Sequence, residues 1–162
     1  MDISDFREMY LKELQEARSV ERQLVDALPR MHDAASDDGL KQALKKHLDE
    51  TRSHLDQVER LLGEHDANPR EHQDQSMRSL VAESEKWAGM LNDGALRDAG
   101  LIASAQRIEH YEIAVYGTLA CWAKQLGLDE DLEALLAILE QEKAADDALS
   151  EFAKRDVNPK AQ

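Results

Sequence analysis

The sequence predicts an all-α protein, and three observations lead to this fold class. Aromatic residues make up only 4% of the chain, β-branched residues are scarce, and no alternation of Val, Ile or Thr persists. Strands therefore have no local support. Apolar residues instead recur every three or four positions over long stretches, which places them on one face of a helix. Only 7 glycines and 3 prolines are available for turns, so helices must build most of the fold.

The first two helices are expected to form a hairpin. The first is predicted over residues 2–35, with a kink at Pro29, because a proline ring removes one backbone hydrogen bond and clashes with the preceding turn. Residues 36–39 supply the stop and the cap of the next helix. The second helix is predicted over residues 40–62 and ends at Gly63.

A long connection follows this hairpin. Residues 63–74 contain Asn68 and Pro69 between charged residues, which predicts a linker. A shorter helix is predicted over residues 76–91. The chain then enters a second hairpin, whose helices run over residues 95–126 and from Asp129 onward, on either side of Gly127.

Four long helices with a long connection between two hairpins predict a ferritin-like antiparallel four-helix bundle with a short extra helix in the crossover. The length fits one domain, since a domain takes roughly 100 to 200 residues. We expect this domain to cover residues 1–155 and residues 156–162 to form a frayed C-terminal tail.

Charge and composition exclude several function classes. The chain has 20 Lys and Arg against 34 Asp and Glu, a net charge of −14, so a nucleic acid or an anionic membrane would repel it. No apolar run approaches the roughly 18 residues that span a bilayer, and the first residues lack the pattern of a signal peptide. We expect a cytoplasmic protein. The single cysteine, Cys121, has no internal disulfide partner, and its surroundings favour packing over redox chemistry.

Each long helix carries one glutamate on its apolar stripe, and these are Glu21, Glu50, Glu109 and Glu142. Glu21 and Glu109 are central on their stripes, whereas Glu50 lies at a stripe edge. Within each hairpin the two glutamates lie at similar sequence distances on either side of the connecting turn, so they face each other at a similar depth in the bundle. Burying four carboxylates together is prohibitive unless cations compensate their charge. The pattern therefore predicts two divalent metal ions, iron or manganese.

Further ligands are expected one helical turn from these glutamates. His54 follows Glu50 by four residues and His47 precedes it by three, so either imidazole could be the ligand, and we favour His54. On the last helix Asp146, four residues after Glu142, takes the corresponding place. The predicted metal ligands are therefore Glu21, Glu50, His54, Glu109, Glu142 and Asp146.

Other polar residues near the stripes have a structural interpretation. A single glutamate among leucines is more often a solvated stripe edge, and we interpret Glu112 in this way; Glu50, taken alone, would merit the same interpretation. Both histidines could be polar core or surface residues. Tyr116 is more often a core residue than a hydrogen-bond donor to a metal ligand.

Four strings of the sequence resemble a known family: VERQLVDALPRM, HLDET, RIEHYEIAVYGTL and LEQEKAADDAL. Together they are similar to the YciE/YciF family of ferritin-like bacterial stress proteins. This resemblance implies a rubrerythrin-like bundle, a cytosolic dimer, and a di-metal site at Glu21, Glu50, Glu109 and Glu142. The chain lacks the Glu-x-x-His repeat of ferritins and rubrerythrins, and Asp146 in place of a histidine makes the site richer in oxygen, which weakens discrimination between iron and manganese.

Two functions of different classes are compatible with these observations. The first is a di-iron or di-manganese carboxylate protein that acts on a small oxidant, oxygen or peroxide, or that oxidises ferrous iron. The alternative is a metal-free helical stress or structural protein that keeps only the bundle. In either case we expect a homodimer, because the crossover helix carries apolar residues such as Trp87 and Met90 that one bundle is not expected to bury entirely.

Overall fold

The computed structural model describes residues 3–70 and 72–162 of the chain. Its helices are α1 (Phe6–Ala34), α2 (Asp38–Glu64), α3 (Gln75–Met90), α4 (Gly94–Leu126) and α5 (Asp129–Phe152), and no strand occurs in these residues. The predicted all-α class is confirmed. The expected start of the first helix at Asp2 lies outside the described residues.

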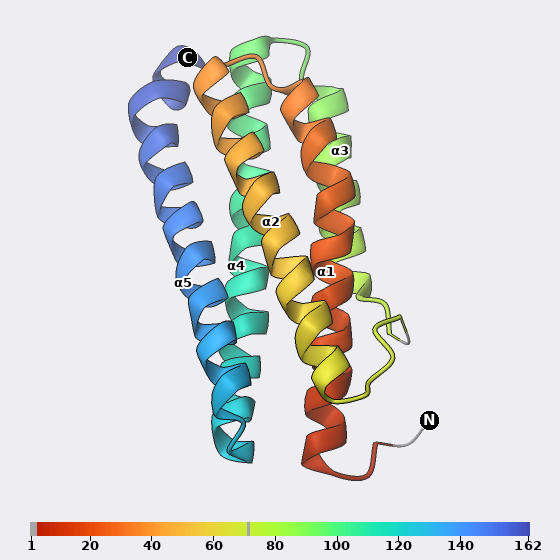
Figure 1. The fold of residues 1–162 in the computed structure, drawn as a ribbon. Helices are drawn as coiled ribbons and strands as arrows, with labels where there is room; N and C mark the ends of the chain where they lie inside the picture. Colours follow the sequence, from red (N-terminus) through yellow and green to blue (C-terminus); the bar gives the residue numbers. More distant parts are fainter. Residues whose placement is uncertain (1–2, 71) are drawn as a thin grey trace.

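The helices form a four-helix bundle with α3 in the crossover, as predicted (Figure 1). Helices α1 and α2 form one antiparallel hairpin, α4 and α5 form the other, and α3 returns along the bundle against α1 and α4. Pro29 lies inside α1, which continues to Ala34. None of the described helices has an apolar stretch long enough to cross a membrane.

Local sequence signals account for the ends of these helices. The side chain of Asp37 accepts hydrogen bonds from the first backbone N–H groups of α2, and Asp93 does the same for α4. Gly127 ends α4 in a left-handed conformation, with φ of 69°, which glycine adopts without a steric penalty. The turn between α1 and α2 is also stabilised by a residue of another helix. The buried carboxylate of Asp98 in α4 accepts hydrogen bonds from the backbone N–H groups of Ser36 and Asp37.

The C-terminal residues differ from the predicted frayed tail. Residues Ala153–Val157 continue α5 as a π-helix, and Asn158–Lys160 form a 3₁₀-helix. Val157 is 2% exposed and packs into the core, and Lys160 Nζ lies 2.8 Å from Asp37 Oδ2. The prediction of fraying is wrong, because the burial of Val157 helps to offset the entropy of ordering these residues, while the exposed ion pair at the start of α2 contributes little.

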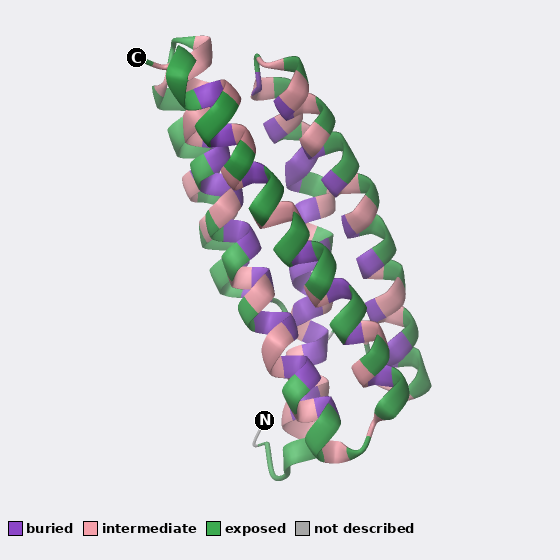
Figure 2. Ribbon diagram, turned by 90° about the vertical axis from the view of Figure 1, so that its left-hand side faces the viewer, coloured by how far each residue is buried: buried purple, intermediate pink, exposed green. Residues whose placement is uncertain are grey.

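The apolar core consists of two clusters along the bundle axis. One cluster includes Leu24, Leu28 and Ile102, and the other includes Leu14, Leu61 and Leu119. Buried residues follow the inner faces of the helices over their whole length (Figure 2). Between the two clusters, the inward positions are occupied by charged residues.

Candidate metal centre

A layer of buried acidic and imidazole side chains separates the two apolar clusters. All four long helices contribute to it, because each has a charged residue on its otherwise apolar inner stripe. None of the six residues is more than 7% exposed. They are Glu21 of α1, His47 and His54 of α2, Glu109 and Glu112 of α4, and Glu142 of α5.

These six residues form two groups that share one member. His47, Glu109, Glu112 and Glu142 offer ligand atoms within 4.8 Å of one another, and so do Glu21, His54 and Glu142. Glu142 thus lies where a single carboxylate could contact two ions. Carboxylates and imidazoles are the ligand types of di-iron and di-manganese bundles, although here both imidazoles come from α2 and not from two different helices.

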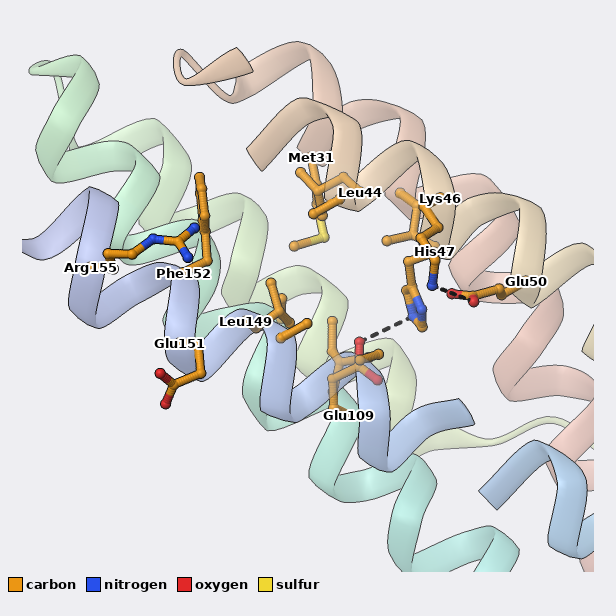
Figure 3. Close-up of a pocket in the computed structure, with 16 residues that line it drawn as sticks. Met31, Leu44, Lys46, His47, Glu50, Glu109, Leu149, Glu151, Phe152 and Arg155 are labelled. Atoms are coloured by element: carbon orange, nitrogen blue, oxygen red, sulfur yellow. Dashed lines mark hydrogen bonds and ion pairs between the residues drawn. The ribbon is translucent and has the colours of Figure 1, made fainter. Parts of the chain in front are cut away.

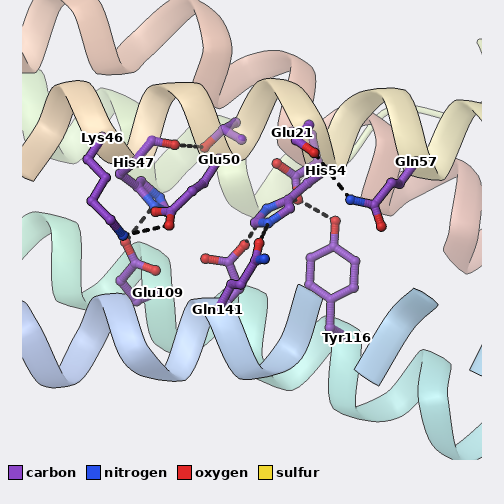
Figure 4. A network of polar contacts seen from close by, with 12 residues as sticks. Glu21, Lys46, His47, Glu50, His54, Gln57, Glu109, Tyr116 and Gln141 are labelled. Atoms are coloured by element: carbon purple, nitrogen blue, oxygen red, sulfur yellow. Dashed lines mark hydrogen bonds and ion pairs between the residues drawn. The ribbon is translucent and has the colours of Figure 1, made fainter. Parts of the chain in front are cut away.

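Direct contacts between these side chains are few. His47 Nε2 lies 3.1 Å from Glu109 Oε1 (Figure 3). His54 Nδ1 lies 2.8 Å from Glu142 Oε1, and its Nε2 lies 2.6 Å from the side-chain oxygen of Gln141. The Tyr116 hydroxyl donates a short hydrogen bond to Glu21 (Figure 4). These contacts orient the side chains of the layer and still leave several carboxylate oxygens available as metal ligands.

Many polar atoms of the layer are buried without a hydrogen bond. Both carboxylate oxygens of Glu112 and of Glu142 are in this state, as is one oxygen each of Glu21 and Glu109. Neither ring nitrogen of His47 makes a hydrogen bond, although Nε2 lies 3.1 Å from Glu109 Oε1. Buried polar atoms are normally satisfied. Carboxylate oxygens and imidazole nitrogens are ligands that suit iron and manganese, so the residues present fit a metal pair.

Burial dominates the electrostatics of the layer. It raises the pKa of Glu21 to about 8, and the charge of Glu142 adds to the effect. Burial and Glu142 likewise raise the pKa values of Glu109 and Glu112 well above the ordinary range. Without a cation, therefore, these carboxyl groups hold protons at neutral pH, and a metal must displace them.

The pair formed by His54 and Glu142 behaves differently. Burial lowers the pKa of His54, but the contact with Glu142 and the charge of Glu21 outweigh it and raise the pKa to about 9. Burial raises the pKa of Glu142, but the contact with His54 outweighs it, so the net pKa is lowered. This pair is therefore ionised at neutral pH. His47, in contrast, has a pKa lowered by burial and stays neutral, which leaves it able to ligate a metal.

Four of the six predicted ligands come together here, namely Glu21, His54, Glu109 and Glu142. The other two lie at the edge of the layer. The Glu50 side chain is 26% exposed and its carboxylate is 2.5 Å from Lys46 Nζ. Asp146 is 15% exposed and faces His110 at 3.4 Å. The structure does not group these two with the others, and their role as metal ligands stays a prediction.

Two members of the layer were not among the predicted ligands. His47 was the alternative imidazole, and the structure brings both histidines into the layer. The interpretation of Glu112 as a solvated stripe edge is wrong, since its side chain is fully buried. One sequence signal was available: Glu112 precedes inward Tyr116 by four residues, so the two share a helical face. Tyr116 itself is both a core residue and a hydrogen-bond donor to Glu21.

Comparisons with known proteins agree with the fold and with the sequence resemblance. Residues 5–162 match a family described as a domain of unknown function, DUF892. Protein YciF of Escherichia coli (strain K12) is 35% identical over 163 residues, covering 100% of this chain and 98% of that protein. The resemblance to the YciE/YciF family is thereby confirmed.

Solved structures extend the same comparison to the fold. The crystal structure of the E. coli stress protein YciF matches with a TM-score of 0.91 and 34% identity, covering 96% of this chain and 99% of that one. YcfI, a putative structural protein from Rhodopseudomonas palustris, matches with a TM-score of 0.89 and 34% identity, covering 92% and 95%.

Proposed function

This chain belongs to the DUF892 family, and we propose that it binds two divalent metal ions, iron or manganese, in the buried layer at the centre of its bundle. One observation carries the proposal. Two groups of candidate ligands, contributed by all four long helices, share Glu142 and contain several carboxylate oxygens with no other partner. The relative YciF is described as a stress protein, and we propose a related role for this chain in the cytoplasm.

The grouping suggests which residues would hold each ion. One ion would be bound by His47, Glu109 and Glu112, the other by Glu21 and His54, and Glu142 would serve both. Glu50 remains a proposed ligand, because its exposed ion pair with Lys46 is worth little and leaves the carboxylate free to turn inward.

Asp146 remains a proposed ligand for a similar reason. Its contacts with Gln106 and His110 are long, 3.4 Å each, so they restrain the carboxylate weakly. Metal content of Glu50→Gln and of Asp146→Asn tests the two residues separately. A variant that keeps the parent's metal content removes that residue from the ligand set.

The proposed activity is removal of peroxide or oxidation of ferrous iron by a small oxidant. Bound iron or manganese ions would supply the electron transfer that carboxylates and imidazoles alone do not provide. The chain's own residues prepare the site. The apolar clusters flank the layer along the bundle, Gln141 contacts Nε2 of His54, and Tyr116 holds Glu21 in place.

Metal quantification together with a peroxide-consumption assay tests this proposal. Protein expressed in metal-replete medium should contain about two ions per chain and consume peroxide. The substitution Glu142→Gln keeps the shape of the side chain but removes the charge shared by both groups, so it should abolish binding of both ions. Glu109→Gln should release the ion held with His47 and leave the other.

The matched control is Glu83→Gln, a change of the same chemistry on the surface of α3, where the side chain is 44% exposed and pairs with Lys86. It should leave metal content and activity unchanged. A parent protein without metal, or a Glu142→Gln variant with the parent's metal content, would show that the di-metal proposal is wrong.

A metal-free structural role is the second candidate, and one observation favours it. The raised pKa values of Glu21, Glu109 and Glu112 allow the layer to stay nearly neutral without any cation. The relative from R. palustris is described as a putative structural protein. If this role is correct, replacing the unpartnered Glu112 with Leu should stabilise the fold, whereas under the di-metal proposal it should lower metal content.

A further inference from the structure

A cavity of about 350 Å³ opens on one side of the candidate metal centre (Figure 3). Its wall is formed by helices α1, α2, α4 and α5 and is mostly apolar. The larger apolar side chains that line it are Leu28, Met31, Leu44, Ile108, Leu149 and Phe152. His47 and Glu109 also line it, and both belong to the candidate metal group. The cavity therefore connects an apolar volume directly to the buried layer.

The volume sets the size of a molecule that fits. A protein cavity of about 150 Å³ lined by Leu, Ile and Phe stays free of water and binds benzene. The cavity here has more than twice that volume. It can take an apolar body of roughly 8 to 12 carbon atoms, as a chain or as two fused rings.

The inner end of the cavity offers two neighbouring hydrogen-bonding groups, the imidazole of His47 and the carboxyl group of Glu109. His47 is 7% exposed, and neither of its ring nitrogens makes a hydrogen bond in the structure. An imidazole that is buried and unpartnered is a recognition element for a polar atom of a ligand, since leaving it unsatisfied is costly. A ligand with its apolar part in the cavity would thus place one polar end beside His47 and Glu109.

The charges at the rim are already paired. Lys46 Nζ lies 2.5 Å from Glu50, and Lys154 Nζ lies 3.2 Å from Glu151. Arg155 Nε lies 2.7 Å from its neighbour Asp156. The rim residues that line the cavity carry two cations, Lys46 and Arg155, and two carboxylates, Glu50 and Glu151, so the rim offers no net countercharge and favours a ligand without net charge.

We propose that this cavity binds an uncharged, mainly apolar organic molecule with a single hydrogen-bonding end, such as a medium-chain alcohol. Because His47 and Glu109 belong both to the cavity and to the candidate metal group, the polar end of the bound molecule lies next to that group. That the molecule is a substrate rests on the proposed function, whereas its binding does not.

Titration calorimetry with 1-octanol tests the inference on the full chain, both after chelator treatment and after loading with manganese. We expect saturable binding of one molecule per chain in both samples. Octanoate, which has the same chain length but a negative charge at pH 7.5, should bind at least tenfold more weakly. Metal content is measured on every sample.

Two variants locate the binding site. Ala148 is exposed at the rim and lines the cavity, so Ala148→Trp should weaken octanol binding at least tenfold by filling the opening. Ala144→Trp makes the same change at an exposed position of α5 outside the lining and should bind octanol like the parent. Ala105→Leu, which adds apolar volume to the buried wall, should also weaken binding.

The outcomes separate this inference from the proposed function. Absence of saturable octanol binding, equal binding of octanoate, or unchanged binding in both Ala148→Trp and Ala105→Leu would each overturn the inference, whatever the metal content. Octanol binding by a protein that takes up no metal would uphold the cavity site and contradict the di-metal proposal alone.

Discussion

Metal-free protein should become less stable as the pH rises from 6.5 to 9, and bound metal should reverse this trend. The folded-state pKa of His54 is about 9 against an ordinary value of 6.5. Its stabilising contribution is therefore fully present below pH 6.5 and is lost as the pH rises through 9. Glu21, with a folded pKa of about 8 against 4.5, also loses its contribution as the pH rises. The lowered pKa of Glu142 acts only at acidic pH, below this window.

The magnitude follows from these pKa values. A pKa difference of one corresponds to about 1.4 kcal/mol, so the change at His54 amounts to about 3 kcal/mol between pH 6.5 and 9. Glu21 faces His54 in the same layer, so the two contributions are not added. For a chain of this length, a loss of that size lowers the melting temperature by roughly 6 to 12 °C.

Urea unfolding followed by circular dichroism, at several pH values with chelator or with excess manganese, measures the effect. Manganese should stabilise the protein increasingly at higher pH, because deprotonated ligands bind it more strongly. Glu21→Gln should flatten the metal-free curve, whereas Glu83→Gln should reproduce that of the parent. A free energy of unfolding that stays constant or rises between pH 6.5 and 9 without metal would refute the assignment of protons in the layer.

Two further predictions concern the ends of the bundle and its outer surface. Tyr10→Phe removes the donor of a 2.6 Å hydrogen bond to buried Asp131. It should therefore lower the free energy of unfolding, measured in urea, by about 1 to 3 kcal/mol. No loss would mean that His65, which lies 2.7 Å from Asp131, satisfies the carboxylate alone. We propose a homodimer formed through α3, where Trp87 is 37% exposed and Met90 is 63% exposed. Sedimentation should show a dimer at micromolar concentration and a shift to monomer for Met90→Glu, and a monomeric parent would contradict the proposal.

Much of the fold could be predicted because it depends on local signals. The spacing of apolar residues defines each helix and its inner face. Asp37 and Asp93 cap helices through their own neighbours in sequence, and Gly127 ends α4 for a conformational reason that needs no distant contact. The same periodicity placed Glu21, Glu109 and Glu142 on inner faces, and the structure buries all three.

The sequence alone, then, determined the helices, their order and the charged residues of their inner stripes, whereas the tertiary structure decided which residues at the stripe edges are enclosed. Glu112 and Glu50 both lie at such edges, yet Glu112 is fully buried and Glu50 reaches Lys46 at the surface. Both histidines of α2 enter the layer, and Val157 folds back onto the core. Helical periodicity fixes the direction in which a side chain points around the axis of its helix. The burial of that side chain depends on how closely the neighbouring helices approach, and packing between residues far apart in the chain sets that distance.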